Sequence, residues 1–219
     1  EGGTHSPYAR GLLHGAQARG WWADLVLWRT CDGTPVNRVR RSYHSGASDD
    51  VEFAIEYIVR TDPGRPVLAH GVSLGGNALL KWLGERGERT PPSLRAAAAV
   101  SVPFDLAAAS KCIDSGFSRV YSRFFLKTLK AKTAAKLAGF PDLVDAAALA
   151  RVRTFWEFDE LVTGPVHGFA GAADYYARAS SLQFLDRIRI PTLLLNAQND
   201  PFLPGSVLDR VSAVERENP

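Results

Sequence analysis

Residues 65–83 read RPVLAHGVSLGGNALLKWL, and this stretch decides the fold. Its pattern predicts a short apolar strand, a glycine-rich turn and then an amphipathic helix. Inside it, Gly71-Val72-Ser73-Leu74-Gly75 fits G-x-S-x-G, a motif in which a serine stands on a sharp turn between a strand and a helix. Glycines there let neighbouring backbone approach without a Cβ clash, and the helix N-terminus points N–H groups at the serine. Ser73 is therefore predicted to be a nucleophile; a structural serine in the turn is the alternative.

The composition is that of an ordinary globular domain. The 219 residues are 46% hydrophobic and 22% charged, which suits one domain with a sizeable core. A net charge of +3 is too small to indicate a nucleic-acid partner, and no apolar run could span a membrane. Cys31 and Cys112 make no disulfide framework and no signal peptide is visible, so we expect a cytoplasmic protein. Because the chain contains no Met, we expect an internal fragment of a longer protein, with tailored ends as the alternative.

Helices and strands alternate through the first half of the chain. Around the opening stretch, the pattern predicts a helix over 8–19, a strand over 21–28, a helix from Ser48 and a strand over 94–102. This alternation predicts a mostly parallel sheet with helices on both faces. The active site of such a sheet lies at the carboxyl ends of the strands, where Ser73 sits. Together these features predict the α/β-hydrolase fold.

The alternation stops after residue 102. Helical segments follow at 104–113, 117–137, 143–152 and 172–180, and we interpret them as a cap inserted into the sheet domain. A strand over 190–196 and a helix over 206–214 then resume the pattern. The predicted division is a first core part (1–102), a helical cap (103–181) and an incomplete second core part (182–219). We therefore expect a fold that is truncated at both ends.

One cap helix carries both an apolar and a basic face. The apolar face consists of Phe117, Val120, Tyr121, Phe124 and Leu129, and the basic stripe consists of Arg119, Arg123, Lys127 and Lys130. The stripe could make a weak contact with an anionic membrane surface. An ordinary solvated face is the alternative.

A candidate catalytic acid follows the cap. Asp200 comes just after the strand over 190–196, where this fold places the acid that orients a general-base histidine. A turn-forming Asp before Pro is the alternative. The histidine should follow the acid in chain order, but all five histidines precede Asp200. We therefore expect the catalytic histidine to lie beyond residue 219.

Two of the five histidines are candidates for lining the pocket. His44 lies in a loop after a strand and His167 lies in the cap, whereas His70 on the incoming strand is expected to be structural. His44 and Asp49 also fit H-x-x-x-x-D, an acyltransferase pattern, but two fixed residues carry little information.

The oxyanion of an acyl-transfer reaction needs two N–H donors. One is predicted to be the N–H of Leu74, the residue after the nucleophile. The other belongs in the loop before the first helix, of which Glu1-Gly2-Gly3 remain. This chemistry requires no metal ion and no cofactor.

Several blocks of the sequence resemble the YheT-like family of α/β-hydrolases. They are Glu1–Tyr8, Arg41–Gly46, the elbow Gly71–Asn77, Val100–Leu106, Gly116–Tyr121, Phe158–Leu161 with His167–Phe169, and Asn199–Phe202. The resemblance covers nearly the whole chain. One departure is Trp28–Gly33, where the family usually has a loop of the NFRGCSG type; this difference concerns the shape of the pocket and not the nucleophile.

The resemblance implies a serine carboxylesterase related to eukaryotic enzymes that hydrolyse monoacylglycerols and phospholipids. It also implies a His-Gly pair before the first block and a catalytic histidine after the last one. We expect hydrolysis of a small or lipid-like ester through an acyl-enzyme, with Ser73 as nucleophile and Asp200 as acid. Because no histidine follows Asp200, a non-catalytic small-molecule binding protein of the same fold is the alternative.

Overall fold

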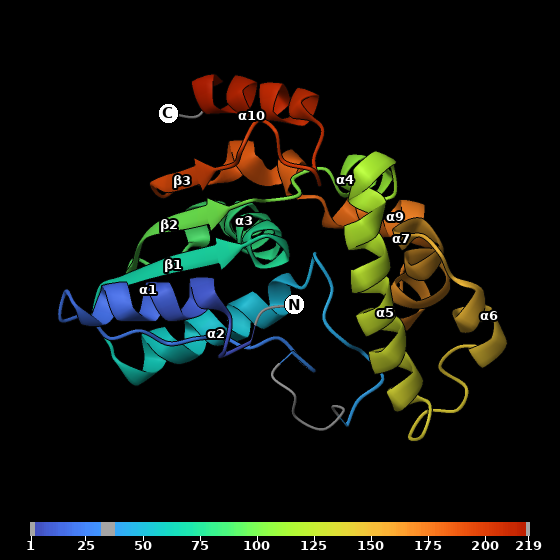
Figure 1. Cartoon of the computed structure of the whole chain (residues 1–219). Helices are drawn as coiled ribbons and strands as arrows, with labels where there is room; N and C mark the ends of the chain where they lie inside the picture. Colours follow the sequence, from blue (N-terminus) through green and yellow to red (C-terminus); the bar gives the residue numbers. More distant parts are fainter. Residues whose placement is uncertain (1–2, 32–37, 218–219) are drawn as a thin grey trace.

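The computed structural model describes residues 3–31 and 38–217. A parallel sheet of three strands lies at its centre, in the order β1-β2-β3 (Figure 1). The strands are β1 (Val67–Val72), β2 (Leu94–Val100) and β3 (Thr192–Leu195). Val72 pairs with Val100, and Val100 pairs with Leu195, so the three strands end level at one edge. The parallel sheet and these three predicted strands are confirmed.

Several helices share one hydrophobic cluster with the sheet. Among them are α2 (Ser48–Thr61), α3 (Leu74–Arg86) and α10 (Gly205–Glu217), which contribute Ile55, Leu80 and Val207. α2 begins as predicted, with Asp49 and Asp50 in its first turn, where their charges suit the positive end of the helix dipole. α1 (Pro7–Gln17) also forms where the sequence predicts a helix, with a proline in its first turn.

The sheet has one packed face and one open face among the described residues. Leu68, Leu193 and Leu195 occupy the same face in register, and their exposed fractions are 56%, 62% and 57%. The opposite face carries Ala97 and Ala99, which are buried in the main cluster. The hydrophobic core therefore lies on the side of the sheet that α3 covers.

The helix after the elbow is buried all round. Every residue of α3 from Gly76 to Gly84 is buried, Lys81 included. The sequence predicts an amphipathic helix here, and that prediction is wrong for these nine residues. Lys81 is accommodated because its Nζ bonds to Ser48 Oγ at 3.1 Å and pairs with Glu85, so its charge keeps polar partners.

The predicted strand over residues 21–28 is wrong. This segment forms no strand in the described chain, and Trp22 is 85% exposed. A strand forms only beside a second strand whose backbone exchanges hydrogen bonds with it. An apolar run in the sequence does not specify that second strand. The turn predicted from Asp32-Gly33-Thr34-Pro35 lies outside the described residues.

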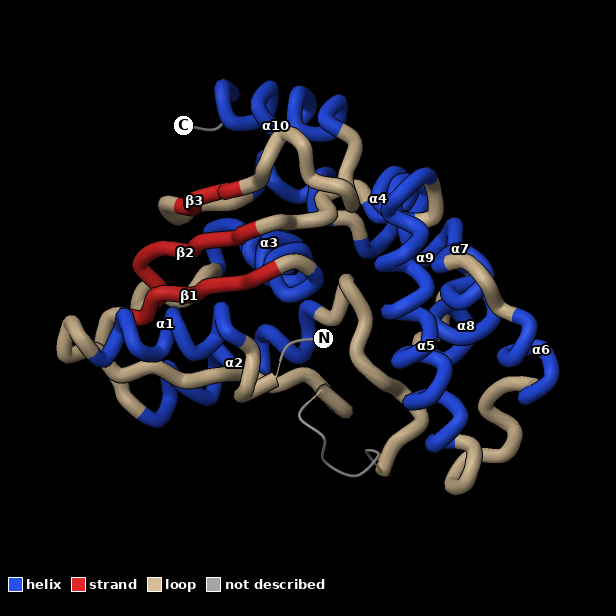
Figure 2. Tube along the Cα trace, viewed as in Figure 1, coloured by secondary structure: helices blue, strands red, loops and turns tan. Residues whose placement is uncertain are grey.

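Helices fill the connection between β2 and β3, as predicted. They are η2 (Gly116–Ser118), α4 (Leu106–Ile113), α5 (Arg119–Lys136), α6 (Ala146–Arg151), α7 (Phe155–Phe158), the π-helix η3 (Asp159–Thr163), α8 (Gly164–Val166), α9 (Ala172–Ala179) and η4 (Ser181–Arg187). The helical run over 155–166 is not predicted from the sequence. Leu126, Val144, Leu149, Val152, Phe158 and Val162 form a separate hydrophobic cluster within this region. Figures 1 and 2 show α4 to α9 gathered beyond the carboxyl ends of the strands.

A close contact fixes α3 against η4, the helical turn that leads back to the sheet. A Cβ built on Gly84 would lie 2.1 Å from the carbonyl oxygen of Phe184, a distance that no real Cβ tolerates. Gly11, by contrast, has no atom within 4 Å of its built Cβ. Glycine at position 84 is therefore required by packing, whereas glycine at position 11 is not.

We expect Gly84→Ala to lower the free energy of unfolding by about 1–3 kcal/mol, because the added methyl forces backbone apart in a packed core. The matched control is Gly11→Ala in the exposed part of α1, which should be neutral or stabilising by up to about 1 kcal/mol. Urea unfolding followed by circular dichroism measures both. Equal stabilities for the two variants would contradict the contact between α3 and η4.

Candidate active site

Ser73 occupies a strained turn between β1 and α3. Its backbone angles are φ 51° and ψ −119°, a left-handed conformation that non-glycine residues rarely adopt. A Cβ on Gly71 would lie 2.7 Å from Gly76 Cα, and one on Gly76 would lie 2.7 Å from Val102 Cγ2. Gly75 is looser, with Trp28 Nε1 at 3.6 Å as its nearest contact. The turn is therefore closed by Gly71 and Gly76, and the second glycine of the motif is not the tight one.

The backbone of Ser73 is fixed while its hydroxyl is available. Its N–H donates to Val100 O at 2.8 Å, and its carbonyl accepts the N–H of Asn77 at 3.0 Å. The side chain is exposed, and its Oγ bonds to no other described residue. Leu74 begins α3, and the first N–H groups of a helix have no intrahelical acceptor. This arrangement presents a hydroxyl beside the positive end of a helix.

Asn77 ties three separate segments together at the elbow. Its side chain is fully buried, and its Nδ2 donates to Ser45 O at 2.9 Å and to Ala179 O at 2.8 Å. Its Oδ1 accepts the N–H of Ser181 at 2.9 Å. No role for Asn77 is predicted from the sequence. The signal that could have found it is an amide side chain directly before the apolar run Ala78–Leu80.

Asp200 lies in the loop after β3, at the same edge of the sheet as Ser73. Its Oδ1 accepts the N–H of Phe202 at 2.8 Å, and its side chain is half-buried. Cys112 of α4 lies nearby, with its Sγ 3.5 Å from Pro201 O. Burial, and then the charge of Asp200, raise the pKa of the Cys112 thiol. β2 separates the strands that carry the two predicted catalytic residues.

His44 and His167 meet in an aromatic cluster between the loop over 41–46 and the cap. Their ring centroids are 4.6 Å apart, and His44 also contacts Phe169 and Tyr175 at 5.5 and 5.7 Å. His44 Nδ1 accepts the N–H of Gly46 at 3.1 Å. Both rings therefore belong to the seam between loop and cap, and their predicted place in the substrate pocket stays a prediction.

Both rings of this pair lie among backbone groups. His167 Nδ1 lies 2.8 Å from Thr163 O, and its Nε2 lies 3.1 Å from Ser42 N and 3.2 Å from Ser42 O. Burial is the main cause that lowers the pKa of both rings. The neighbouring His167 lowers the pKa of His44 further, to about 3. Both histidines are thus neutral at pH 7.

Lys136 of α5 joins the same loop to the cap. Its buried Nζ donates to Arg40 O at 2.6 Å, to Arg41 O at 3.1 Å and to Ser42 Oγ at 3.1 Å. Burial lowers the pKa of this lysine to about 8. The acyltransferase pattern finds no support at this loop, because Asp49 pairs with Arg41 while His44 bonds to Gly46.

The other three histidines are exposed. His5 Nδ1 contacts Arg10 Nη2 at 2.8 Å, His14 lies in α1, and His70 lies on β1 opposite Ala98. Burial of part of the ring lowers the pKa of His70. Within the described residues, no three His, Cys, Asp or Glu side chains group as metal ligands would.

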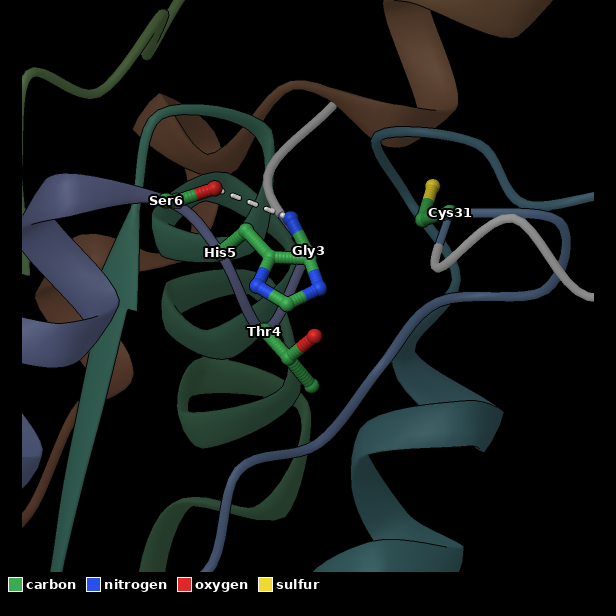
Figure 3. Close-up of a pocket in the computed structure, with 5 residues that line it drawn as sticks. All are labelled: Gly3, Thr4, His5, Ser6 and Cys31. Carbon is green, nitrogen blue, oxygen red and sulfur yellow. Dashed lines mark hydrogen bonds between the residues drawn. The ribbon is translucent and has the colours of Figure 1, made fainter.

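A cavity of about 300 Å³ lies beside the start of the chain. Gly3, Thr4, His5, Ser6 and Cys31 line it (Figure 3). The predicted second oxyanion donor belongs to this loop, of which Glu1 and Gly2 lie outside the described residues. The N–H of Gly3 donates to Ser6 Oγ at 2.9 Å, as Figure 3 shows, and is engaged in this structure. A second cavity of about 520 Å³ lies along α4 and includes Lys111, Cys112 and Pro204.

The chain belongs to the alpha/beta hydrolase fold family, because residues 28–214 match the sequence profile of that family. The predicted fold class is confirmed. No helix in the described part of the chain has the length and hydropathy needed to cross a bilayer.

Three relatives place the chain within this family. The candidate esterase YheT of Escherichia coli is 43% identical over 96% of this chain and 62% of its own length. The monoacylglycerol lipase of Saccharomyces cerevisiae is 29% identical over 97% of this chain and 49% of its own length. Phospholipase ABHD3 of Mus musculus is 31% identical over 81% of this chain and 43% of its own length. The predicted resemblance is confirmed, and the chain spans about half the length of these curated relatives.

The neutral histidine pair makes stability depend on pH. An unfolded histidine binds a proton below about pH 6.5, whereas folded His44 stays neutral to about pH 3. The free energy of unfolding should therefore fall as pH drops from about 6.5 towards 3, by about 1.4 kcal/mol per pH unit for this residue. Urea unfolding should show that the stability gap between wild type and His44→Gln narrows between pH 7 and pH 5.

The matched control is His14→Gln, which replaces an exposed histidine of α1 and should keep the wild-type dependence on pH. If the His44→Gln and wild-type curves run parallel, His44 is not held neutral in the seam.

Proposed function

We propose that the protein is an ester hydrolase that acts through an acyl-enzyme formed on Ser73. The observation that carries this proposal is the exposed serine held at φ 51° at the end of β1, directly before the N-terminus of α3. Such strain costs on the order of 1–3 kcal/mol and is typical of functional sites. The similarity to proteins named esterase, lipase and phospholipase supports the same reaction class.

In the first step, Ser73 Oγ forms a bond to the ester carbonyl carbon while a histidine takes the hydroxyl proton. The N–H of Leu74 donates to the oxyanion that develops on the carbonyl oxygen. The alcohol leaves with the proton from the imidazolium, and the acyl group stays on Ser73. Water, activated by the same histidine, then attacks the acyl carbon and releases the carboxylic acid. No metal ion or cofactor takes part in these steps.

Asp200 is proposed to orient that histidine. Neighbouring strands lie about 4.8 Å apart, so the ends of β1 and β3 are separated by about 10 Å across β2. An imidazole that donates to a carboxylate on one side and accepts from a hydroxyl on the other bridges a gap of this size. The positions of Ser73 and Asp200 at one edge of the sheet support this role.

We propose that the histidine and the second oxyanion donor come from chain outside these 219 residues. No histidine follows Asp200 in the sequence, and two of the five present are held in the seam by ring contacts and backbone hydrogen bonds. On this proposal, the 219 residues alone have little or no esterase activity.

The proposed substrates are lipid-like esters, since two of the similar proteins are named for monoacylglycerol and phospholipid substrates. A binding protein without catalysis is the second candidate, and the absence of a histidine after Asp200 is the observation that favours it.

In the full-length protein, we expect Ser73→Ala to lower kcat on p-nitrophenyl esters on the order of 10⁶-fold, because the nucleophile is lost. The matched control is Ser101→Ala: Ser101 is exposed, stands at the end of the next strand and also has a positive φ of 52°. It should keep turnover within a few-fold of wild type.

Unchanged turnover in Ser73→Ala would remove Ser73 from the reaction. A wild-type protein that binds esters but turns none over would favour the binding-protein candidate.

A further inference from the structure

The cap exposes an apolar face on η2 and α5. Phe117, Val120, Tyr121 and Phe124 are 77%, 55%, 41% and 67% exposed. Their spacing of three, four and seven residues places them on one side of the helix. Large apolar side chains gathered in this way mark a surface that contacts something other than water. We call these four residues the aromatic face.

The side of α5 that packs into the cap lies opposite the aromatic face. The opposite side of the helix is buried, with Leu126 in the cap cluster and Ser122 bonded to Asp114. Leu129, which the sequence groups with the aromatic face, packs against that cluster instead. The exposed surfaces of the four residues can therefore contact a partner while the other side of α5 stays packed in the cap.

Positive charge borders the aromatic face. Arg119, Arg123 and Lys127 are exposed and make no ion pair or hydrogen bond with another described residue. Lys130, the fourth residue of the predicted basic stripe, does not belong to this exposed charge. Its Nζ donates to Ala150 O at 2.7 Å and to Val152 O at 2.9 Å and so helps to build the cap. α5 contains no Asp or Glu between residues 119 and 136. The surface therefore combines exposed aromatic rings with unpaired positive charge.

The aromatic face continues into the loop of the predicted catalytic acid. The Tyr121 ring lies 5.2 Å from the Phe202 ring, two residues after Asp200. Ser118 Oγ donates to Pro201 O at 2.6 Å. In Figure 1, α5 stands beyond the carboxyl ends of the strands, on the side of the molecule where Ser73 lies. A surface that this face contacts is therefore also close to the candidate active site.

We propose that the aromatic face docks on an anionic lipid bilayer, with the rings at the level of the headgroups and the three cations against acidic lipid. Aromatic side chains flanked by Lys and Arg on one amphipathic helix are the features that such a surface recognises. The inference rests on the proposed lipid-like substrate, because docking brings the site to the surface that holds it. Charge complementarity favours the bilayer over a second copy of this chain, since α5 offers no acidic side chains to its own stripe.

Flotation of the full-length protein with phosphatidylcholine vesicles, with and without phosphatidylserine, tests the docking. Wild type should bind preferentially to vesicles that contain phosphatidylserine, and high salt should weaken that binding. Phe117→Ser combined with Phe124→Ser should lower the partition coefficient on the order of tenfold. Replacing Arg119, Arg123 and Lys127 with Gln should remove the preference for phosphatidylserine.

The matched control is Phe53→Ser on α2, which removes an aromatic ring that is 70% exposed but lies outside the cap. It should bind vesicles as wild type does. Equal binding of wild type to both kinds of vesicle, or unchanged binding of the Phe117→Ser, Phe124→Ser variant, would overturn the proposal. So would sedimentation showing a wild-type dimer that this variant abolishes, since a second copy would then cover the face.

Kinetics separate this proposal from the proposed function. The Phe117→Ser, Phe124→Ser variant should hydrolyse a short water-soluble ester as wild type does and lose turnover only on ester presented in vesicles. Ser73→Ala should lose both reactions but keep vesicle binding. If Ser73→Ala stays active while docking occurs as described, the assignment of the nucleophile fails and the docking surface stands.

Discussion

The buried amide of Asn77 is the contact on which the arrangement around Ser73 depends. It satisfies the carbonyl of Ser45 in the loop before α2, and the carbonyl of Ala179 and the N–H of Ser181 where the cap returns to the core. Each of these backbone groups would cost about 1–3 kcal/mol if it were buried without a partner. Gly46 allows the approach, because a Cβ there would lie 2.6 Å from Ala179 Cβ. One side chain thus fixes the elbow helix, the loop and the end of the cap in a single geometry.

Polar contacts continue that junction outward. Tyr175 accepts the N–H of Ser45 on its hydroxyl at 2.9 Å, and Lys136 holds the carbonyls of Arg40 and Arg41. Behind them, the buried Asp159 accepts the Tyr176 hydroxyl at 2.6 Å, and burial raises its pKa to about 6. Directional bonds of this kind set the position of the cap relative to the carboxyl edge of the sheet, where substrate would enter.

Local patterns in the sequence predict the helices and strands near the elbow. The features that these patterns do not predict depend on contacts between residues far apart in the chain. The elbow, β2, β3 and the cap helices α4, α5, α6 and α9 follow from glycine placement and hydrophobic periodicity, which act within a few residues. The segment over 21–28 has the composition of a strand, but it pairs with no strand among residues 3–31 and 38–217. Asn77 and the ring pair of His44 and His167 depend on residues about 100 or more positions apart, and no spacing rule reaches that far. Gly76, and not Gly75, closes the turn because Val102, two residues after the end of β2, packs against it.

We propose that the strained turn makes Ser73 an activated nucleophile. Treatment of the full-length protein with a fluorophosphonate, followed by digestion and mass spectrometry of the peptides, tests this role of Ser73. We expect one adduct, on the peptide that contains Ser73, which disappears when the protein is unfolded before treatment because activation depends on the folded turn. An adduct on another serine, or equal labelling of the folded and unfolded protein, would contradict it.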